Sequence, residues 1–231
     1  MQENISKIKE FYYIMPESFQ EAFNFHINQW DNVLGFYVTY FVYFVPIITG
    51  CYSIILGTRL LSKEEQNKTA EFLLSRPLSR SQIISSKLLT FFIHILIINL
   101  LAFFTGLIGS GIVSNWNFNL KSFVILHTYG WLICFLFGLL GFYITVVMKR
   151  AKAITGIGVG IVLGTYLFDV MIRVFGEVQF LLYLTPFKFI NLDAHSPDYG
   201  FDAWRLIYFI GISVLLIVLS YVFYKRKDIL V

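Results

Sequence analysis

The chain has 231 residues, of which 57% are hydrophobic, 19% aromatic and 14% charged. Together with a mean hydropathy of +0.71, this composition excludes a soluble globular domain, whose surface needs more polar residues. The formal net charge is +4, but the basic residues gather beside apolar segments and give no support to nucleic-acid binding. We therefore expect one integral membrane domain.

Five apolar segments are long enough to cross a bilayer, because about 20 apolar residues in a helix span about 30 Å of hydrocarbon. They cover residues 33–58, 88–113, 122–148, 153–176 and 204–224. A β-barrel would show short segments of alternating polarity, whereas these runs are continuously apolar. The sequence predicts an all-α integral membrane protein with about five transmembrane helices, in a membrane domain that spans residues 33–231.

Basic residues predict the orientation of these helices, since they are more frequent on the cytoplasmic side. The polar insert at residues 59–87 carries six basic and three acidic residues, a net +3. Two further basic clusters, Lys149 to Lys152 and Lys225 to Lys227, fall on the same side if the spans alternate. Residues 1–32 and 177–203, which are acidic on balance, then lie outside. We expect a multi-pass protein of the cytoplasmic membrane, with its N-terminus outside and its C-terminus in the cytoplasm.

The insert at residues 59–87 contains two helix-start signals. Ser62-x-x-Glu65 and Ser79-x-x-Gln82 each have the spacing of a capping box, and Pro77 ends the first helix. The pattern predicts a helix, an elbow and a second helix, with an apolar patch between charged residues. Such a patch suits either docking onto another protein or an interfacial helix in the headgroups.

Several motifs in this insert and beyond it resemble those of ABC-2 type transporter permeases. In the insert they are Glu64-Glu65, Lys68-Thr69-Ala70-Glu71, Leu73-Leu74-Ser75-Arg76-Pro77, Ser79-Arg80, Ile83 and Lys87. Leu184-Thr185-Pro186-Phe187 before the last span, and the basic-Asp-Ile tail after it, add weaker matches. One departure is Lys68, which stands where the family usually has glycine.

The resemblance implies that the loop at residues 59–87 is a cytoplasmic coupling element that packs against a separate ATP-binding subunit. The implied coupling residues are Glu64, Glu65, Thr69, Glu71, Phe72, Leu73, Leu74, Arg76, Pro77 and Arg80. It also implies a re-entrant or interfacial segment in the outer loop at residues 177–203. Permeases of this family usually have six spans, so the first helix is expected to be absent here. Residues 1–32 would then be an outer amphipathic segment, with a helix that starts near Pro16.

No motif for ATP hydrolysis is found, because the chain lacks the G-x-x-x-x-G-K-[ST] phosphate loop. Clustered carboxylates, a His-Glu-x-x-His motif and a nucleophile motif are missing as well. We expect no enzyme activity, no metal site and no cofactor in this chain. The resemblance implies that ATP and magnesium are bound by the partner subunit.

A few polar or helix-perturbing residues fall near the middle of the first two spans. Pro46, Thr49, Ser53 and Asn99 are candidates for lining a transport pathway, although hydroxyl side chains in spans usually bond their own helix. The apolar surroundings favour an amphipathic, peptide-like or lipophilic cargo.

Three glycines at four-residue spacing, Gly156, Gly160 and Gly164, let another helix approach closely. We favour packing within the subunit over packing in a permease dimer.

Other residues in the spans receive structural interpretations. Asp169 and Arg173 are four residues apart and predict an interfacial ion pair. His94 is interpreted as a hydrogen-bonded packing residue, and Cys51 and Cys134 as small core residues.

The resulting expectation is the permease subunit of an ATP-driven exporter, working as a homodimer or heterodimer with two copies of a separate ATPase. The alternative is a membrane binding or immunity protein that does not transport. It would act without any partner ATPase.

Overall fold

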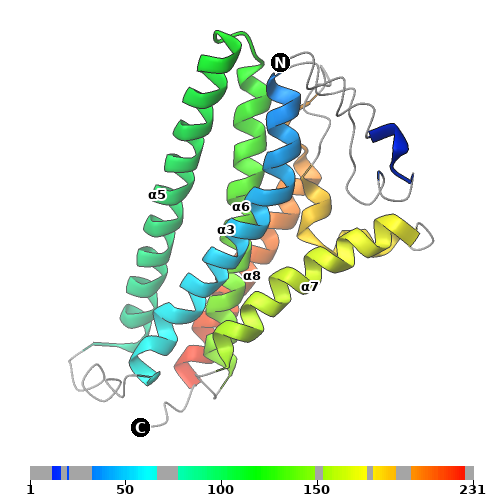
Figure 1. Cartoon of the computed structure of the whole chain (residues 1–231). Coiled ribbons are helices and arrows are strands. Elements are labelled where there is room, and N and C mark those ends of the chain that lie inside the picture. Colours follow the sequence, from blue (N-terminus) through cyan, green and yellow to red (C-terminus); the bar gives the residue numbers. More distant parts are fainter. Residues whose placement is uncertain are drawn as a thin grey trace. The chain divides into compact units, whose positions relative to one another are not determined.

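The computed structural model describes residues 12–16, 20, 33–66, 78–148, 153–175, 179–190 and 199–226. Its elements are α3 (Val33–Gln66), α5 (Arg80–Ser114), α6 (Leu120–Val147), α7 (Ile154–Phe175), η2 (Gln179–Leu184), η3 (Pro186–Phe189) and α8 (Ala203–Arg226) (Figure 1). Within these ranges there is no strand, and all five α-helices named here are long and apolar enough to cross a membrane. The predicted all-α class with five spans is confirmed. The prediction for residues 1–32 falls almost entirely outside the described residues.

The helices that flank the polar insert are longer than predicted. Helix α3 continues to Gln66, and Ser62, the predicted start of a new helix, is fully buried inside α3. The predicted helix start at Ser62 is therefore wrong. The physical reason is that Leu61 is also buried, 6% exposed, in a cluster with other helices, so α3 continues past Arg59 because its inner face still packs.

The second predicted helix start is confirmed. Helix α5 begins at Arg80, and the Gln82 side-chain oxygen accepts hydrogen bonds from the backbone N–H of Ser79 (2.8 Å) and from its hydroxyl (3.0 Å). The backbone N–H of Gln82 lies 3.3 Å from Ser79 Oγ. This reciprocal pattern satisfies amide groups that have no partner within the helix.

Two compact units make up the chain. The first comprises residues 1–46, 102–130 and 164–201, and the second comprises residues 47–101, 131–163 and 202–231. Each unit is described by itself below.

In the second unit, α3 and α6 cross at glycines. A Cβ atom added to Gly57 would overlap the carbonyl oxygen of Gly138, and one added to Gly141 would lie 2.6 Å from the carbonyl oxygen of Ile54. At Gly138 an added Cβ would overlap the ring of Phe91 on α5. Small residues therefore let three helices approach closely, which is how helices commonly associate in lipid.

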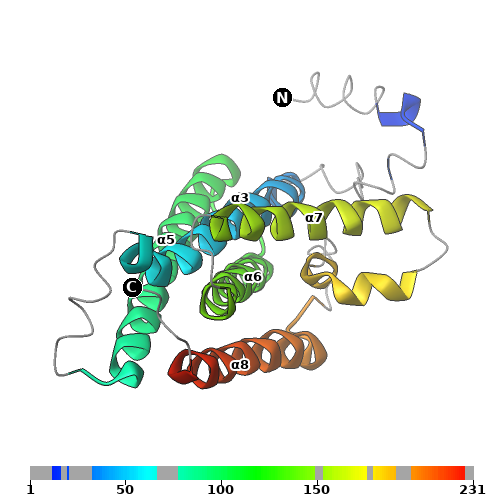
Figure 2. The same ribbon diagram turned by 90° about the horizontal axis from the view of Figure 1, so that it is seen from below.

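Two apolar clusters complete the core of the second unit, and Figure 2 shows the ribbons of the helices that contribute to them. One consists of Leu61, Ile83, Ile84, Phe142, Val146 and Tyr224, and the other of Phe91, Ile95, Cys134, Leu139 and Leu216. The first cluster joins the last turns of α3, α6 and α8 to the first turn of α5.

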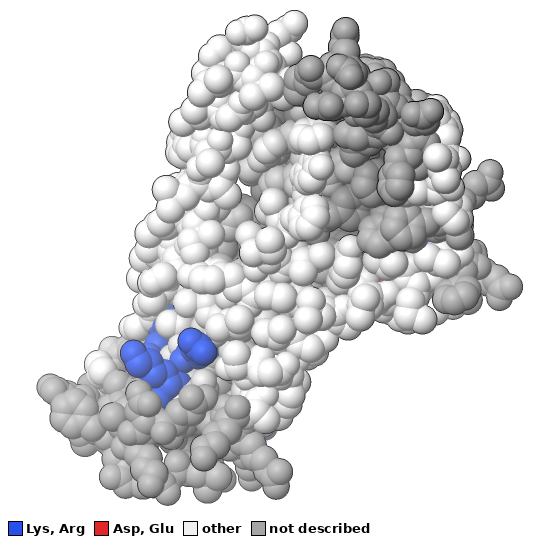
Figure 3. Space-filling model, in the orientation of Figure 1, with Lys and Arg blue, Asp and Glu red and all other residues white. Residues whose placement is uncertain are grey.

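Basic residues gather at this end of the second unit. The exposed or half-buried ones are Arg59, Lys63, Arg80, Lys87, Lys225 and Arg226, and Figure 3 shows blue side chains near the lower end of the visible face. The described basic residues of α3, α5 and α8 therefore lie on one side of the unit.

The outward face of α5 in the second unit combines large exposed apolar side chains with a polar row. Ser86 and Thr90 donate hydrogen bonds to the carbonyls of Gln82 and Ser86, respectively, at 2.9 Å each. His94 Nδ1 lies 2.8 Å from the carbonyl oxygen of Thr90, so Nδ1 must carry the hydrogen. His94 is hydrogen-bonded as predicted, but it is exposed rather than packed against a neighbouring helix.

Candidate functional site

The residues predicted to couple this chain to an ATPase are only partly described. Thr69, Glu71, Phe72, Leu73, Leu74, Arg76 and Pro77 lie outside the described residues. Glu64 and Glu65 belong to the last turns of α3. Only Arg80 has a described side chain, and it contacts α8.

Arg80 contacts the C-terminal end of α8. Its Nη1 donates to the carbonyl oxygens of Tyr224 at 3.4 Å and of Lys225 at 3.1 Å. One turn further along α5, Ser85 Oγ lies 2.7 Å from the hydroxyl of Tyr221. Two polar contacts thus join the start of α5 to the last turns of α8.

Three of the four predicted pathway residues come together in the second unit. The side chains of Thr49, Ser53 and Asn99 lie near the thiol of Cys134, which is fully buried. Pro46 is also buried in α3 but belongs to the first unit. The sequence singled out these positions by polarity alone, and it treated Cys134 as a separate core residue.

The same polar residues also bond their own helices. Ser53 Oγ donates to the carbonyl of Thr49 at 2.6 Å, and Asn99 Nδ2 donates to the carbonyl of Ile95 at 2.8 Å. Ser53 is 1% exposed and Asn99 is half-buried. The cluster is therefore a polar site in an apolar core whose donors are largely satisfied, as buried polar groups need to be.

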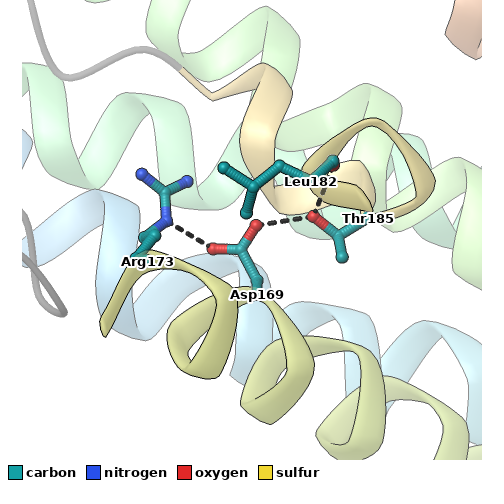
Figure 4. Close-up of polar contacts among 4 residues, drawn as sticks. All are labelled: Asp169, Arg173, Leu182 and Thr185. Atoms are coloured by element: carbon teal, nitrogen blue, oxygen red, sulfur yellow. Dashed lines mark hydrogen bonds and ion pairs between the residues drawn. The ribbon is translucent and has the colours of Figure 1, made fainter. Parts of the chain in front are cut away.

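The third candidate site, in the first unit, is a buried carboxylate on α7. Arg173 Nε donates to Oδ2 of Asp169 at 2.7 Å, which confirms the predicted ion pair. Asp169 is only 4% exposed, and its other oxygen, Oδ1, lies 2.5 Å from the hydroxyl of Thr185 (Figure 4). Thr185 Oγ1 is also 3.0 Å from the carbonyl of Leu182. A hydroxyl has one hydrogen to donate, and the shorter distance favours the carboxylate.

Thr185 belongs to the motif Leu184-Thr185-Pro186-Phe187 and separates η2 from η3. Phe187 is 6% exposed and packs edge-on against Tyr166 of α7, with ring centroids 5.5 Å apart. Lys188 Nζ lies 3.5 Å from the centroid of the Tyr183 ring. The predicted outer segment therefore contains two short 3-10 helices that dock on α7 through one polar and one aromatic contact.

A second polar site in the first unit was missed by the sequence analysis. The Tyr37 hydroxyl and His127 Nε2 are 2.8 Å apart, and His127 is packed against the rings of Phe41, Phe103 and Phe123, with centroid distances of 4.6, 5.2 and 4.5 Å. Neither residue lies in a motif. An ionisable residue within an apolar span was the only available signal.

The three glycines of α7 that were predicted to pack against another helix have no described neighbour at the position of an added side chain. A Cβ atom added to Gly156, Gly160 or Gly164 would meet no described atom within 4 Å. Packing of these glycines against another helix of the subunit is therefore not seen in the described ranges. The tight glycine packing lies instead between α3 and α6.

No group of three or more His, Cys, Asp or Glu residues that could hold a metal ion occurs in the described part of the chain. The polar sites described above consist of hydrogen-bonded pairs and the ion pair of Asp169 with Arg173, set among apolar helices. Such contacts are suited to positioning helices.

Comparison with protein families decides the identity of this helical assembly. The family model described as ABC-2 family transporter protein matches residues 1–229. The chain belongs to the ABC-2 transporter family. Comparison with curated proteins and with solved structures found no match. ABC-2 permeases are membrane subunits that normally lack ATPase domains and generally pair with an ATP-binding subunit.

Proposed function

We propose that this ABC-2 family protein is the permease subunit of an exporter that is driven by a separate ATPase. The family match over residues 1–229 is the observation that carries the proposal. The cargo would be amphipathic, peptide-like or lipophilic, because the spans are predominantly apolar. The working assembly would contain two permeases, identical or different, and two ATPase copies.

The end of the second unit that carries Arg80 would face the cytoplasm, with the N-terminus of the chain outside. This orientation agrees with the basic residues on α3, α5 and α8 at that end. The ATPase would dock on the coupling residues of the insert from Glu64 to Pro77. Closure of the ATPase pair would then move the ends of α3 and α5.

The cargo pathway would include the polar cluster at Cys134, with Thr49, Ser53 and Asn99. Its position on facing helices of one unit supports this choice. The open glycines of α7, Gly156, Gly160 and Gly164, would face the second permease, since small residues allow close helix contact.

The proposal is tested by purifying the tagged chain from its native host in mild detergent and identifying the proteins that co-purify. We expect an ATPase in equal amount and ATP hydrolysis that vanadate inhibits. Leu73→Asp combined with Arg76→Glu should abolish co-purification, because it places charge in the apolar patch and reverses a charge beside it.

Lys121→Glu, an exposed charge reversal at the start of α6, is the matched control and should leave co-purification unchanged. A folded chain that purifies without an ATPase, and that acts fully in a host without candidate ATPases, would overturn the proposal. That result would favour the binding or immunity protein.

A further inference from the structure

The contact between Arg80 and α8 assigns this arginine a role inside the subunit. In α8 (Ala203–Arg226), the backbone carbonyls of Tyr224 and Lys225 lie in the last described turn, and both accept hydrogen bonds from Arg80. The guanidinium also places a positive charge beside two carbonyl oxygens of that turn. Arg80 therefore binds α8 from another helix.

A second contact runs parallel to the first. Ser85 Oγ donates to the carbonyl of Ser81 at 2.7 Å, so its one hydrogen is already used. The hydroxyl of Tyr221, 2.7 Å away, must then be the donor to Ser85 Oγ. Tyr221 therefore holds α8 to α5 one turn before the carbonyls that Arg80 binds.

Apolar packing supports both polar contacts. The Tyr224 side chain is 6% exposed and packs in the cluster that contains Leu61 of α3, Ile83 and Ile84 of α5 and Phe142 of α6. Its backbone carbonyl meanwhile accepts from Arg80. Tyr224 therefore contacts α3 and α5, the helices on both sides of the insert, through its ring, and it contacts α5 through its backbone as well.

We propose that the C-terminal end of α8 moves together with the start of α5, and that Arg80 is the positioning residue that joins them. The inference rests on the proposed function: a displacement delivered to the insert would reach α8 directly, besides α3 and α5. Arg80 then acts through the carbonyls of α8 rather than by touching the ATPase. Both hydrogen bonds come from the single nitrogen Nη1, and lysine could not replace the arginine fully because its shorter side chain would carry the ammonium less far toward the two carbonyls.

The test measures the distance between spin labels at Leu89 of α5 and Phe223 of α8, which are 60% and 43% exposed, in a chain with C51S and C134S. We expect a narrow distance distribution that stays unchanged when the permease–ATPase complex is trapped with ATP and vanadate. In Arg80→Ala the population outside the wild-type distances should rise roughly tenfold, because two charge-assisted hydrogen bonds are lost. The ATPase should still co-purify in normal amount.

Three further variants sharpen the test. Arg226→Ala removes an exposed arginine from the same helix end and should leave the distribution unchanged. Arg80→Lys should give an intermediate effect, and Tyr221→Phe should broaden the distribution with the Arg80 contacts intact, which covers the case in which Arg80→Ala does not fold.

An unchanged distribution in folded Arg80→Ala would overturn the inference, and so would loss of the ATPase from Arg80→Ala with the distances preserved. The nucleotide-free permease alone also reports on the contact. If the chain has no ATPase partner, the proposed function is refuted. The distance distribution of the permease alone would still decide the role of Arg80.

Discussion

The hydroxyl of Thr185 lies 2.5 Å from Oδ1 of Asp169, although the two residues are 16 positions apart in the sequence. This contact joins the segment of η2 and η3 to α7, and Arg173 completes it from the next turn of the helix. The carboxylate is almost fully buried, whereas the Arg173 side chain is 24% exposed. Substituting Arg173 and substituting Asp169 should therefore lower the free energy of unfolding by different amounts.

Removing Arg173 should destabilise the protein more than neutralising Asp169. Arg173→Gln leaves a buried carboxylate without its counter-ion, which typically costs about 3 kcal/mol. Asp169→Asn keeps an acceptor for Thr185 and leaves an arginine whose side chain is 24% exposed, so we expect a loss of about 1 kcal/mol. The measurement is the free energy of unfolding in mixed micelles.

Arg205→Gln is the control, since its partner Asp202 is 48% exposed. This variant should change the free energy of unfolding by less than about 0.5 kcal/mol. Equal losses for Arg173→Gln and Asp169→Asn would contradict this account.

Adding a methyl group at the crossing of α3 and α6 should destabilise the fold. Gly57→Ala would press its Cβ against the carbonyl of Gly138, and such overpacking costs about 1–3 kcal/mol. Gly160→Ala, where the added Cβ meets no described atom, should leave the unfolding midpoint of the monomer almost unchanged. If Gly57→Ala were as stable as Gly160→Ala, the close approach of the two helices would be wrong.

Larger side chains on α7 should separate folding from dimer formation. Gly160→Leu has room within the described part of the subunit, so we expect normal thermal stability. Cross-linking between two permeases should fall, because the leucine keeps the second helix away from the small-residue face. Full cross-linking in Gly160→Leu would place the dimer contact elsewhere.

Tyr37 and His127 should show strong coupling in a double-mutant cycle. Tyr37→Phe or His127→Phe alone leaves a polar group without its partner among aromatic rings, at a cost of about 1 kcal/mol or more. The double variant removes both polar groups, so its loss of unfolding free energy should be smaller than the sum of the single losses. Additive losses would show that the 2.8 Å contact contributes nothing to stability.

Access to the Cys134 thiol should report on the proposed pathway. In a C51S chain the buried thiol should react slowly with a small maleimide in the resting complex, because its side chain is fully buried. Trapping the complex with ATP and vanadate should raise the labelling rate if the pathway opens beside Thr49 and Asn99. An unchanged rate in a complex with active ATPase would remove this cluster from the pathway.

The sequence predicted the five spans well, because continuous apolar runs of this length have few alternatives in a bilayer. It ended the first span at residue 58 and began the second at residue 88, whereas α3 continues to Gln66 and α5 begins at Arg80. Hydropathy marks where hydrocarbon begins, whereas a helix continues as long as one face packs, as Leu61 and Ile83 do. The capping box at Ser79 was readable because it is local in sequence.

Contacts between helices were much harder to predict. The glycines of α7 have regular spacing, but a Cβ added there would meet no atom of the described residues. Gly57 and Gly138 lie in no motif and yet make the close crossing. Which face of a helix meets which neighbour depends on the other helices, and a single sequence does not contain that information. The pairings of Arg80 with α8 and of Asp169 with Thr185 were missed for the same reason.

The polar row on α5 has a consequence for how this helix meets lipid. Ser86, Thr90 and His94 all direct a hydrogen to a carbonyl one turn earlier, so these donors demand nothing from a neighbouring molecule. Acyl chains can slide past such a surface with little resistance, because no bond to the protein has to break. When α5 moves, the resistance would come almost entirely from its inner face, where the ring of Phe91 packs against Gly138.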